Sequence, residues 1–459
     1  MALFALAVYR AATLSFTVDE ATTYVTYVVH GWTGIFHGPF DANNHILYSI
    51  LEKFTRQWFG PSEFSLRLPA LAGAALFLWS VARLCAMLIP GLWFSLLGFL
   101  LVTANPITLD FMAAARGYGL ALGLLAFALL MWIEWLEDER GFRIALASIA
   151  LGLSVSANLM FAFASIALFS AGCLFLIRRQ RFKLIPAAVV PAIVIPLALW
   201  WAPFQDYSPD AFYFGTPTIY ASTESMELAV FDHDFTRGDP FENWSTLFFL
   251  RWWILPYLVP LLWCCIVFWI RRRLTEGLAL TTLVFGTACF GMWLAHVWLK
   301  VLYPEERTGL SFIFFFLLTW TAAIGVWWQT NRVTRWTLAF PSLLLALVFL
   351  AQFAGQFDPR YFGAWRVNWK MHQIMSDLRA REGPGEHKLR THWIYQSTAE
   401  YYRLRWKMAF DPIVREPDKF DLVNADYFLI PIPTREQAAA TGLHILYRDE
   451  VTGTTLLEK

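Results

Sequence analysis

Two adjacent carboxylates, Asp19 and Glu20, stand in the stretch FTVDEATTYV, directly after the first apolar segment of the chain. A carboxylate placed there can remove a proton from a reacting hydroxyl. Adjacent side chains point in different directions in both helices and strands, so the two acids are not expected to share one role. We interpret Asp19 as a candidate base and Glu20 as a group that orients it or contacts substrate. Alternatively, both acids cap the next helix and favour its positive end.

A second group of polar side chains lies in the later stretch AHVWLKVLYPEERTG. Its members are spaced four, three and four residues apart, which predicts one shared helical face. They are His296, Lys300, Tyr303 and Arg307. This stripe suits a phosphate or diphosphate, with Lys300 and Arg307 as ligands. Arg307 could instead pair with Glu305 or Glu306 in an ordinary loop network, and His296 is equally well explained as a core histidine.

The stretch ANPITLDFMAAARGYG carries another acid and another arginine. Asp110 could bind a substrate hydroxyl or a metal, or it could simply pair with Arg116. An arginine so near the bilayer should face the protein interior or a polar cavity. Its guanidinium matches phosphate oxygens, and Tyr118 follows it in the same candidate phosphate site. Snorkelling to the headgroups is the alternative for Arg116, and Arg67 is interpreted as an interfacial anchor.

Scattered histidine and polar residues in the first loop lack the fixed spacing of a metal site. They are His37, Asp41, Asn44 and His45. Turn and capping roles explain them better, and a bound divalent metal is left open. Asn44 and His45 are kept as candidates for the acceptor side or the loop, together with His296.

The composition indicates the environment that these residues share. Hydrophobic residues make up 58% of the 459 residues and charged residues only 15%, and the mean hydropathy is +0.47. Soluble domains are about one-quarter charged, so the chain is predicted to be a membrane protein. The net charge of +1 gives no reason to expect a polyanionic partner such as a nucleic acid. The five cysteines lie in apolar stretches and are interpreted as small core residues.

Apolar segments predict about eleven membrane-spanning helices. They cover residues 1–17, 66–88, 92–108, 117–136, 144–157, 160–177, 184–202, 247–270, 278–300, 309–328 and 336–354. The first lacks a basic leader and a cleavage site, so we interpret it as a retained span. Basic loops at 178–183, 271–277 and 331–335 are predicted to be cytoplasmic. The opposite, external side then receives the 18–65 loop, the acidic 203–246 loop and everything after residue 354.

Two regions outside the spans are predicted to fold. Residues 46–58 place Ile46, Ile50, Phe54 and Trp58 at helical spacing, with Glu52 among the polar residues on the other side. This pattern predicts an amphipathic helix in the membrane interface, capped by residue 43 or 44. The charged 355–459 region is predicted to form a small external α/β domain. Its expected strands are KLRTHWIYQ, ADYFLIPIP, LHILYRDE and TGTTLLEK, and its expected helix is STAEYYRLRW.

These motifs together resemble the GT-C superfamily of membrane glycosyltransferases. The resemblance rests on the acid pair after the first span, on FSLRLPALAGAALFLW, ANNHILYSIL and AARGYGLALGLL, and on YPEERTGLSF in a late external loop. It covers about residues 10–330 and is greatest to the bacterial branch of protein O-mannosyltransferases and the lipid A aminoarabinose transferase. Asn44-His45 stands where that branch often has Pro-Pro, so the acceptor-side details differ.

The resemblance implies an all-α GT-C membrane bundle and an inverting glycosyltransferase. Such an enzyme transfers a sugar from a polyprenyl-phosphate donor to an acceptor hydroxyl of a lipid, glycan or protein. The expected location is the cytoplasmic membrane of a bacterium, with the site facing the periplasm or exterior. Asp19 would be the base, and the cations would stabilise the departing phosphate.

Two other functions were weighed against transfer. A lipid or glycan flippase needs polar residues through the bilayer midplane, whereas the candidate residues here cluster at the external ends of the spans. A sensor with a ligand-binding C-terminal domain leaves the acid pair unexplained.

Overall fold

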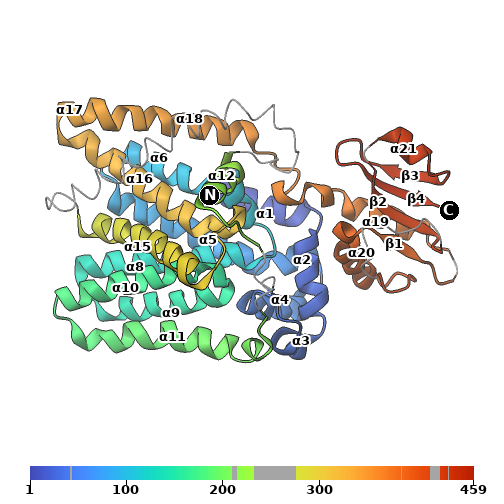
Figure 1. The fold of residues 1–459 in the computed structure, drawn as a ribbon, viewed down its shortest axis with the longest axis horizontal. Coiled ribbons are helices and arrows are strands. Elements are labelled where there is room, and N and C mark those ends of the chain that lie inside the picture. The colour runs from blue at the N-terminus through green and yellow to red at the C-terminus, as the bar shows by residue number, and fades with distance from the viewer. Residues whose placement is uncertain (42–43, 209–213, 232–274, 384, 414–423, 433) are drawn as a thin grey trace.

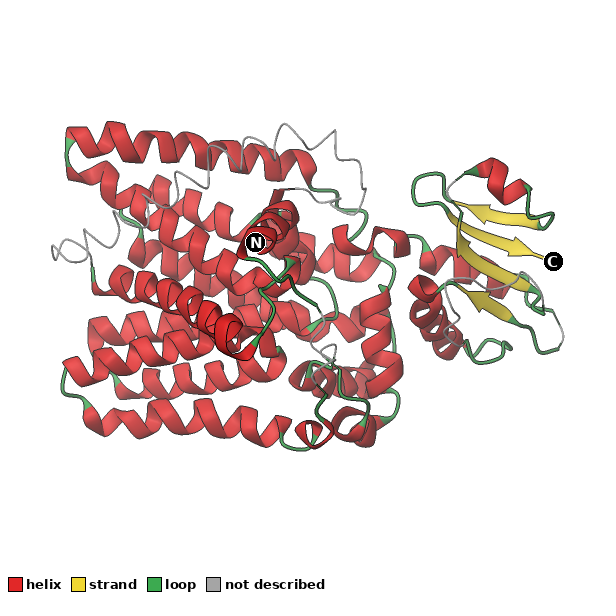
Figure 2. Cartoon of the chain, in the orientation of Figure 1, coloured by secondary structure: helices red, strands yellow, loops and turns green. Residues whose placement is uncertain are grey.

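The computed structural model describes residues 1–459 except 42–43, 209–213, 232–274, 384, 414–423 and 433. A bundle of long helices occupies most of the molecule, and a small sheet with its own helices stands at one end of the bundle (Figure 1). Figure 2 shows that all four strands belong to this terminal part. The predicted combination of a helical bundle and a small C-terminal sheet is therefore present.

The bundle is built from apolar helices, most of them long. They are α1 (Ala2–Thr13), α5 (Glu63–Leu88), α6 (Leu92–Thr103), α8 (Gly117–Asp138), α9 (Gly141–Ala157), α10 (Ala162–Arg178), α11 (Ile185–Trp200), α15 (Glu276–Leu299), α16 (Leu310–Thr330), α17 (Arg332–Thr334) and α18 (Phe340–Gln356). Their packing buries a continuous apolar core that includes Trp132, Trp135 and Trp320.

Seven helices of the described residues are long and apolar enough to cross a membrane, or eight if the bent pair Ala2–Thr13 and Val18–Val28 forms one span. The predicted number of eleven is therefore not reproduced in this part of the chain. The 92–108 prediction became α6, whose 12 residues extend about 18 Å and fall short of a bilayer core of about 30 Å. Helix α9, predicted at 144–157, is also short, with 17 residues. The predicted span at 247–270 lies outside the described residues.

The loop after α10 and the region of α17 lie at the end of the bundle opposite the sheet (Figure 1). In this loop Arg179 contacts Glu139 at 3.0 Å and also pairs with Glu276 at the start of α15. The described parts of the basic loops therefore share one end, as the alternation of the predicted spans required.

Between α1 and α5 the chain forms three helices at the sheet end, α2 (Val18–Thr23), α3 (Gly31–His37) and α4 (Ile46–Phe59). A π-helical turn, Tyr24–Val28, extends α2. Gly31, whose φ of 68° suits glycine, stands at the break between this run and α3. Helix α4 starts at Ile46 with His45 at its N-cap position, so the cap predicted at residue 43 or 44 is wrong.

The orientation of α4 also differs from the expectation for Glu52. The apolar side chain of Trp58 is 69% exposed, whereas Glu52 is fully buried. The apolar face of α4 is buried at Ile46, which belongs to a core cluster against which Ile50 packs, and it becomes exposed only towards Trp58. Glu52, predicted to lie on the polar side, points into the protein rather than into water.

The C-terminal part contains a four-stranded sheet with strand order β1-β2-β4-β3. The strands are β1 (Leu389–Thr391), β2 (Tyr427–Pro431), β3 (His444–Arg448) and β4 (Thr454–Glu458). Strands β1 and β2 are parallel, and the other two pairings are antiparallel. Helices α19 (Met371–Ala380), α20 (Trp393–Trp406) and α21 (Arg435–Ala439) accompany the sheet.

One boundary in this part was predicted wrongly. The strand expected over KLRTHWIYQ is only three residues long, and α20 begins at Trp393 instead of in the STAEYYRLRW segment. The reason is local, because the His392 side chain accepts a hydrogen bond from the Ile394 backbone N–H and caps the helix early.

The C-terminal part is joined by hydrogen bonds to the segment that carries Asp19. Asn368 accepts a hydrogen bond from the Val18 backbone N–H at 3.0 Å. Thr22 donates to Ser397 at 2.9 Å, and the Phe16 N–H donates to the Tyr402 hydroxyl at 3.1 Å. Residues 350 or more positions apart in the sequence therefore join α2 and the segment before it to the C-terminal part.

Candidate active site

Asp19 lies in the first turn of α2, where Thr17 forms a capping box with Glu20. Its Oδ2 atom is 3.5 Å from Arg307 Nη2 and 3.8 Å from Arg116 Nη2. This oxygen is buried and accepts no hydrogen bond from the described residues, while the side chain as a whole keeps 18% of its surface exposed. Asp19 is thus held electrostatically between two cations and retains a free acceptor atom.

Arg116 opens α8 and faces the protein interior, with 1% of its surface exposed. Its Nη1 donates to the Asp19 carbonyl at 3.1 Å and lies 3.2 Å from the Thr23 hydroxyl. Of the two alternatives for this residue, burial is therefore correct and snorkelling is wrong.

Arg307 reaches the same carboxylate from a 3₁₀ turn, Glu306–Gly309. Its guanidinium lies 4.2 Å from the ring centre of Phe214, in the loop that follows residue 203. Tyr118 interacts with this guanidinium, and Glu306 Oε2 lies 3.5 Å from Nη1. The loop pairing considered as an alternative is therefore present, together with the contact to Asp19.

The helical stripe predicted around Arg307 is wrong. Helix α15 ends at Leu299, and Lys300 has a positive φ of 58°. Lys300 is exposed, and Tyr303 pairs in extended conformation with Thr216. His296 stacks on Tyr303 with ring centres 4.1 Å apart, and its Nδ1 is 2.8 Å from the Val301 carbonyl. The break in the helix separates these residues from Arg307, which alone among the four contacts Asp19.

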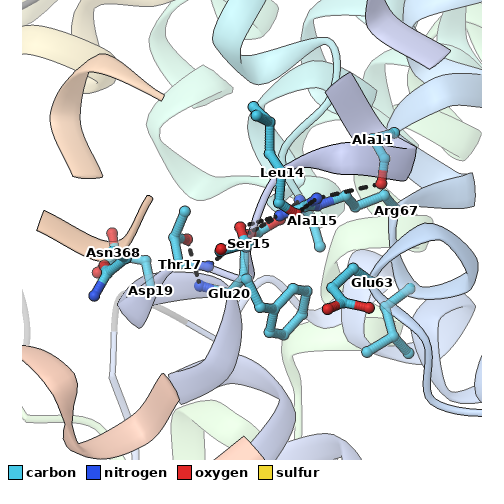
Figure 3. Close-up of polar contacts among 12 residues, drawn as sticks. Ala11, Leu14, Ser15, Thr17, Asp19, Glu20, Glu63, Arg67, Ala115 and Asn368 are labelled. Atoms are coloured by element: carbon cyan, nitrogen blue, oxygen red, sulfur yellow. Dashed lines mark hydrogen bonds and ion pairs between the residues drawn. The ribbon is translucent and has the colours of Figure 1, made fainter. Parts of the chain in front are cut away.

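Glu20 forms a buried network separate from Asp19. Its Oε1 and Oε2 each lie 2.8 Å from the Arg67 guanidinium, and both side chains are fully buried. The carboxylate also accepts from the Thr17 and Ala115 backbone N–H groups. Figure 3 shows these contacts converging on Arg67, with Asp19 outside them. Glu20 therefore ties α2, α5 and the loop before α8 together, and the prediction of Arg67 as an interfacial anchor is wrong.

Asp110 forms an ion pair with Arg10. One alternative had predicted a pair with Arg116 instead. The Oδ1 atom of Asp110 is 2.6 Å from Arg10 Nη2, and its Oδ2 accepts from the Gly363 N–H at 2.7 Å. Asp110 lies in the short helix α7 (Pro106–Phe111), and a small cavity beside it is also lined by Glu306 and Arg307. These contacts favour a role in positioning α7 and residue 363 beside the site.

Substitution of Asp110 can distinguish a positioning role from a role in proton transfer. Asp110→Asn keeps the shape but removes the charge that balances buried Arg10, so we expect a loss of about 3–5 kcal/mol in the free energy of unfolding, as for other buried ion pairs. Thermal unfolding of the purified variant measures this loss. A variant as stable as the parent but with a greatly reduced turnover number would instead support an acid–base role.

Asn44 and His45 differ in whether their side-chain polar atoms form hydrogen bonds. Asn44 donates to the Ile35 carbonyl and accepts from the Ser49 hydroxyl, so it links α3 with α4. His45 packs against Tyr118 with ring centres 5.3 Å apart. Its Nε2 atom is buried without a hydrogen-bond partner among the described residues. Within the same residues, no three His, Cys, Asp or Glu side chains lie close enough to hold a metal ion.

Three site-forming residues were not identified as such from the sequence. They are Arg10, Arg67 and Glu52. A signal existed for the arginines, because a cation inside an apolar segment needs a buried partner. The partner itself could not be read from the sequence, since Arg10 and Asp110 are 100 residues apart.

Comparison with known proteins identifies the fold. No protein-family model and no curated protein match the chain. The crystal structure of ArnT from Cupriavidus metallidurans bound to undecaprenyl phosphate aligns with a TM-score of 0.55 at 11% identity, over 99% of this chain and 96% of that chain.

Two further solved structures align less well. Arabinosyltransferase EmbB from Mycobacterium smegmatis gives a TM-score of 0.41 at 13% identity, over 81% of this chain and 42% of that chain. The Archaeoglobus fulgidus oligosaccharyltransferase gives 0.46 at 12% identity, over 88% and 61%. The chain described here therefore shares its fold with ArnT, as its motifs predicted.

Proposed function

We propose that this chain is a membrane glycosyltransferase that moves a sugar from a polyprenyl-phosphate donor to an acceptor hydroxyl. The observation that carries the proposal is the position of Asp19 Oδ2, buried without a hydrogen bond from the described residues and within 4 Å of two arginines. A base and phosphate-binding cations are the groups that such a transfer needs. The fold shared with ArnT, whose crystal structure contains undecaprenyl phosphate, supports a lipid-phosphate donor.

In the proposed sugar-transfer step, Asp19 accepts a proton and the two arginines stabilise the departing phosphate. The acceptor oxygen attacks the anomeric carbon and forms the new glycosidic bond, while its proton passes to the Asp19 carboxylate. The bond between the anomeric carbon and the phosphate oxygen breaks, and its electron pair stays on the phosphate. Arg116 and Arg307 stabilise this charge. A single displacement of this kind inverts the anomeric centre.

The two adjacent acids have different roles in this proposal. Asp19 touches the reacting hydroxyl, whereas Glu20 acts as a positioning residue because its oxygens are occupied by Arg67 and backbone groups. Lys300 is left out, since it is exposed after the end of α15. The site would face the periplasm or exterior of a bacterial cytoplasmic membrane, because the described parts of the basic loops lie at the other end of the bundle.

Reconstituted protein tests the proposal directly. Proteoliposomes receive a panel of polyprenyl phosphates that carry radiolabelled sugars, together with lipid, glycan and peptide acceptors. Transfer predicts free polyprenyl phosphate and labelled acceptor in equal amounts. Movement of intact donor between leaflets without its cleavage would identify a flippase and contradict the proposal.

Arg307→Ala should weaken donor binding. Loss of a charged hydrogen bond to phosphate costs about 1.5–3 kcal/mol, so we expect the KM for the donor to rise about 10- to 100-fold while the KM for the acceptor changes little. Arg360→Ala is the matched control, because Arg360 is 71% exposed and pairs with Asp358. An unchanged donor KM in Arg307→Ala would refute the phosphate site.

A further inference from the structure

Helix α4 presents polar side chains to the interior of the protein at successive turns. His45, Ser49 and Glu52 are spaced four and three residues apart, and at most 3% of any one of them is exposed. Ser49 is satisfied by Asn44. The other two are not: His45 Nε2 and both carboxyl oxygens of Glu52 are buried without a hydrogen-bond partner among the described residues.

These unsatisfied groups lie beside the proposed active site. Glu52 interacts electrostatically with Arg116 and Glu20, and His45 interacts with Arg116 and Arg307. Both groups are therefore within electrostatic range of Arg116, one of the two arginines that contact Asp19. A buried polar group without a partner destabilises a protein, so two such groups beside one site suggest that a ligand satisfies them.

The surroundings of both groups disfavour their charged forms. Burial raises the pKa of Glu52 well above its ordinary value, and the nearby Glu20 raises it further, against the opposing effect of Arg116 and Arg56. Burial lowers the pKa of His45 well below its ordinary value, with Arg116 and Arg307 acting in the same direction. A neutral carboxyl and a neutral imidazole can each donate one hydrogen bond and accept another.

We propose that Glu52 and His45 bind hydroxyl groups of the sugar on the donor. The inference rests on the proposed function and deepens it by naming residues that contact the sugar. A hydroxyl donates and accepts, which matches the buried atoms without partners, the two carboxyl oxygens of Glu52 and Nε2 of His45.

Two substitutions of Glu52 distinguish the possibilities. Glu52→Gln keeps an uncharged side chain that donates and accepts, so kcat/KM for the donor should stay within about threefold of the parent. Glu52→Leu removes both hydrogen bonds, so kcat/KM should fall about 10- to 100-fold. Lys53→Gln is the matched control on the same helix, because Lys53 packs on Trp32 and away from this group.

Two further readouts exclude a merely structural role. The parent should discriminate at least tenfold between the donor and one of its mono-deoxy analogues, and Glu52→Leu should reduce this ratio below about threefold. The thermal unfolding midpoint of Glu52→Leu should equal or exceed that of the parent, because an unsatisfied buried carboxyl is removed.

The opposite results would overturn the inference. These are full activity and unchanged discrimination in Glu52→Leu, a lowered midpoint that accounts for its lost activity, or equal losses in both variants. Failure of the proposed function is distinguishable, since the parent itself would then cleave none of the donors.

Discussion

Asp19→Asn is expected to lower the turnover number for sugar transfer about 10²- to 10⁴-fold, the usual contribution of a general base. The substitution keeps the shape of the side chain and removes its capacity to take a proton. The KM for the donor should stay the same or fall, because Arg116 and Arg307 lose a competing carboxylate 3.5–3.8 Å away. Single-turnover transfer with purified variant measures the rate, and donor titration measures the KM.

Asp358→Asn is the control for this experiment, because Asp358 is an acid paired with the exposed Arg360. The variant should transfer at the parent's rate. If Asp19→Asn also transfers at that rate, Asp19 is not the base. A parallel rise in donor KM would instead indicate that Asp19 binds the donor.

The second large effect is a loss of folding stability in the Glu20→Gln variant. Glu20→Gln leaves the fully buried Arg67 guanidinium without a counter-charge, and loss of one partner in a buried ion pair costs about 3–5 kcal/mol. Thermal unfolding in detergent should therefore show a clear drop in the midpoint. Activity should fall with it, since Glu20 also holds the Ala115 N–H next to Arg116.

A double substitution tests the pairing itself. Glu20→Gln with Arg67→Met removes both charges, so the double variant should be less destabilised than the sum of the two single variants. Additive losses would show that the two side chains do not depend on each other. Asp358→Asn again provides the reference, with a change below about 1 kcal/mol expected at this exposed pair.

Local sequence was sufficient to predict that Arg116 is buried. This arginine was expected to face the interior because lipid disfavours a cation near the bilayer, and its side chain is buried in the structure.

The helical stripe predicted around Lys300 is wrong, because the periodicity argument assumes a continuous helix. The positive φ of Lys300 and the extended chain at Tyr303 interrupt it.

The amphipathic pattern of α4 predicted a helix correctly but placed Glu52 wrongly among solvated residues. Hydrophobic spacing distinguishes the two faces of a helix but does not say what lies against each one. In α4, Ile46 on the apolar face and Glu52 on the polar face are both fully buried. Burial of Glu52 therefore became evident only from the fold.

The amino-acid sequence alone determined that the chain is a membrane protein with a small C-terminal sheet, and its motifs predicted the fold that it shares with ArnT. Composition and hydrophobic runs are properties of neighbouring residues, and the fold followed from the resemblance of short motifs. The sequence also proposed Asp19, Arg116 and Arg307, which the structure brings together. Only the tertiary structure decided which charges meet. Glu20 with Arg67, Arg10 with Asp110, and Asp19 with two arginines are separated by 47 or more positions. Such partners are selected by packing, because a buried charge is stable only where a distant segment brings its complement.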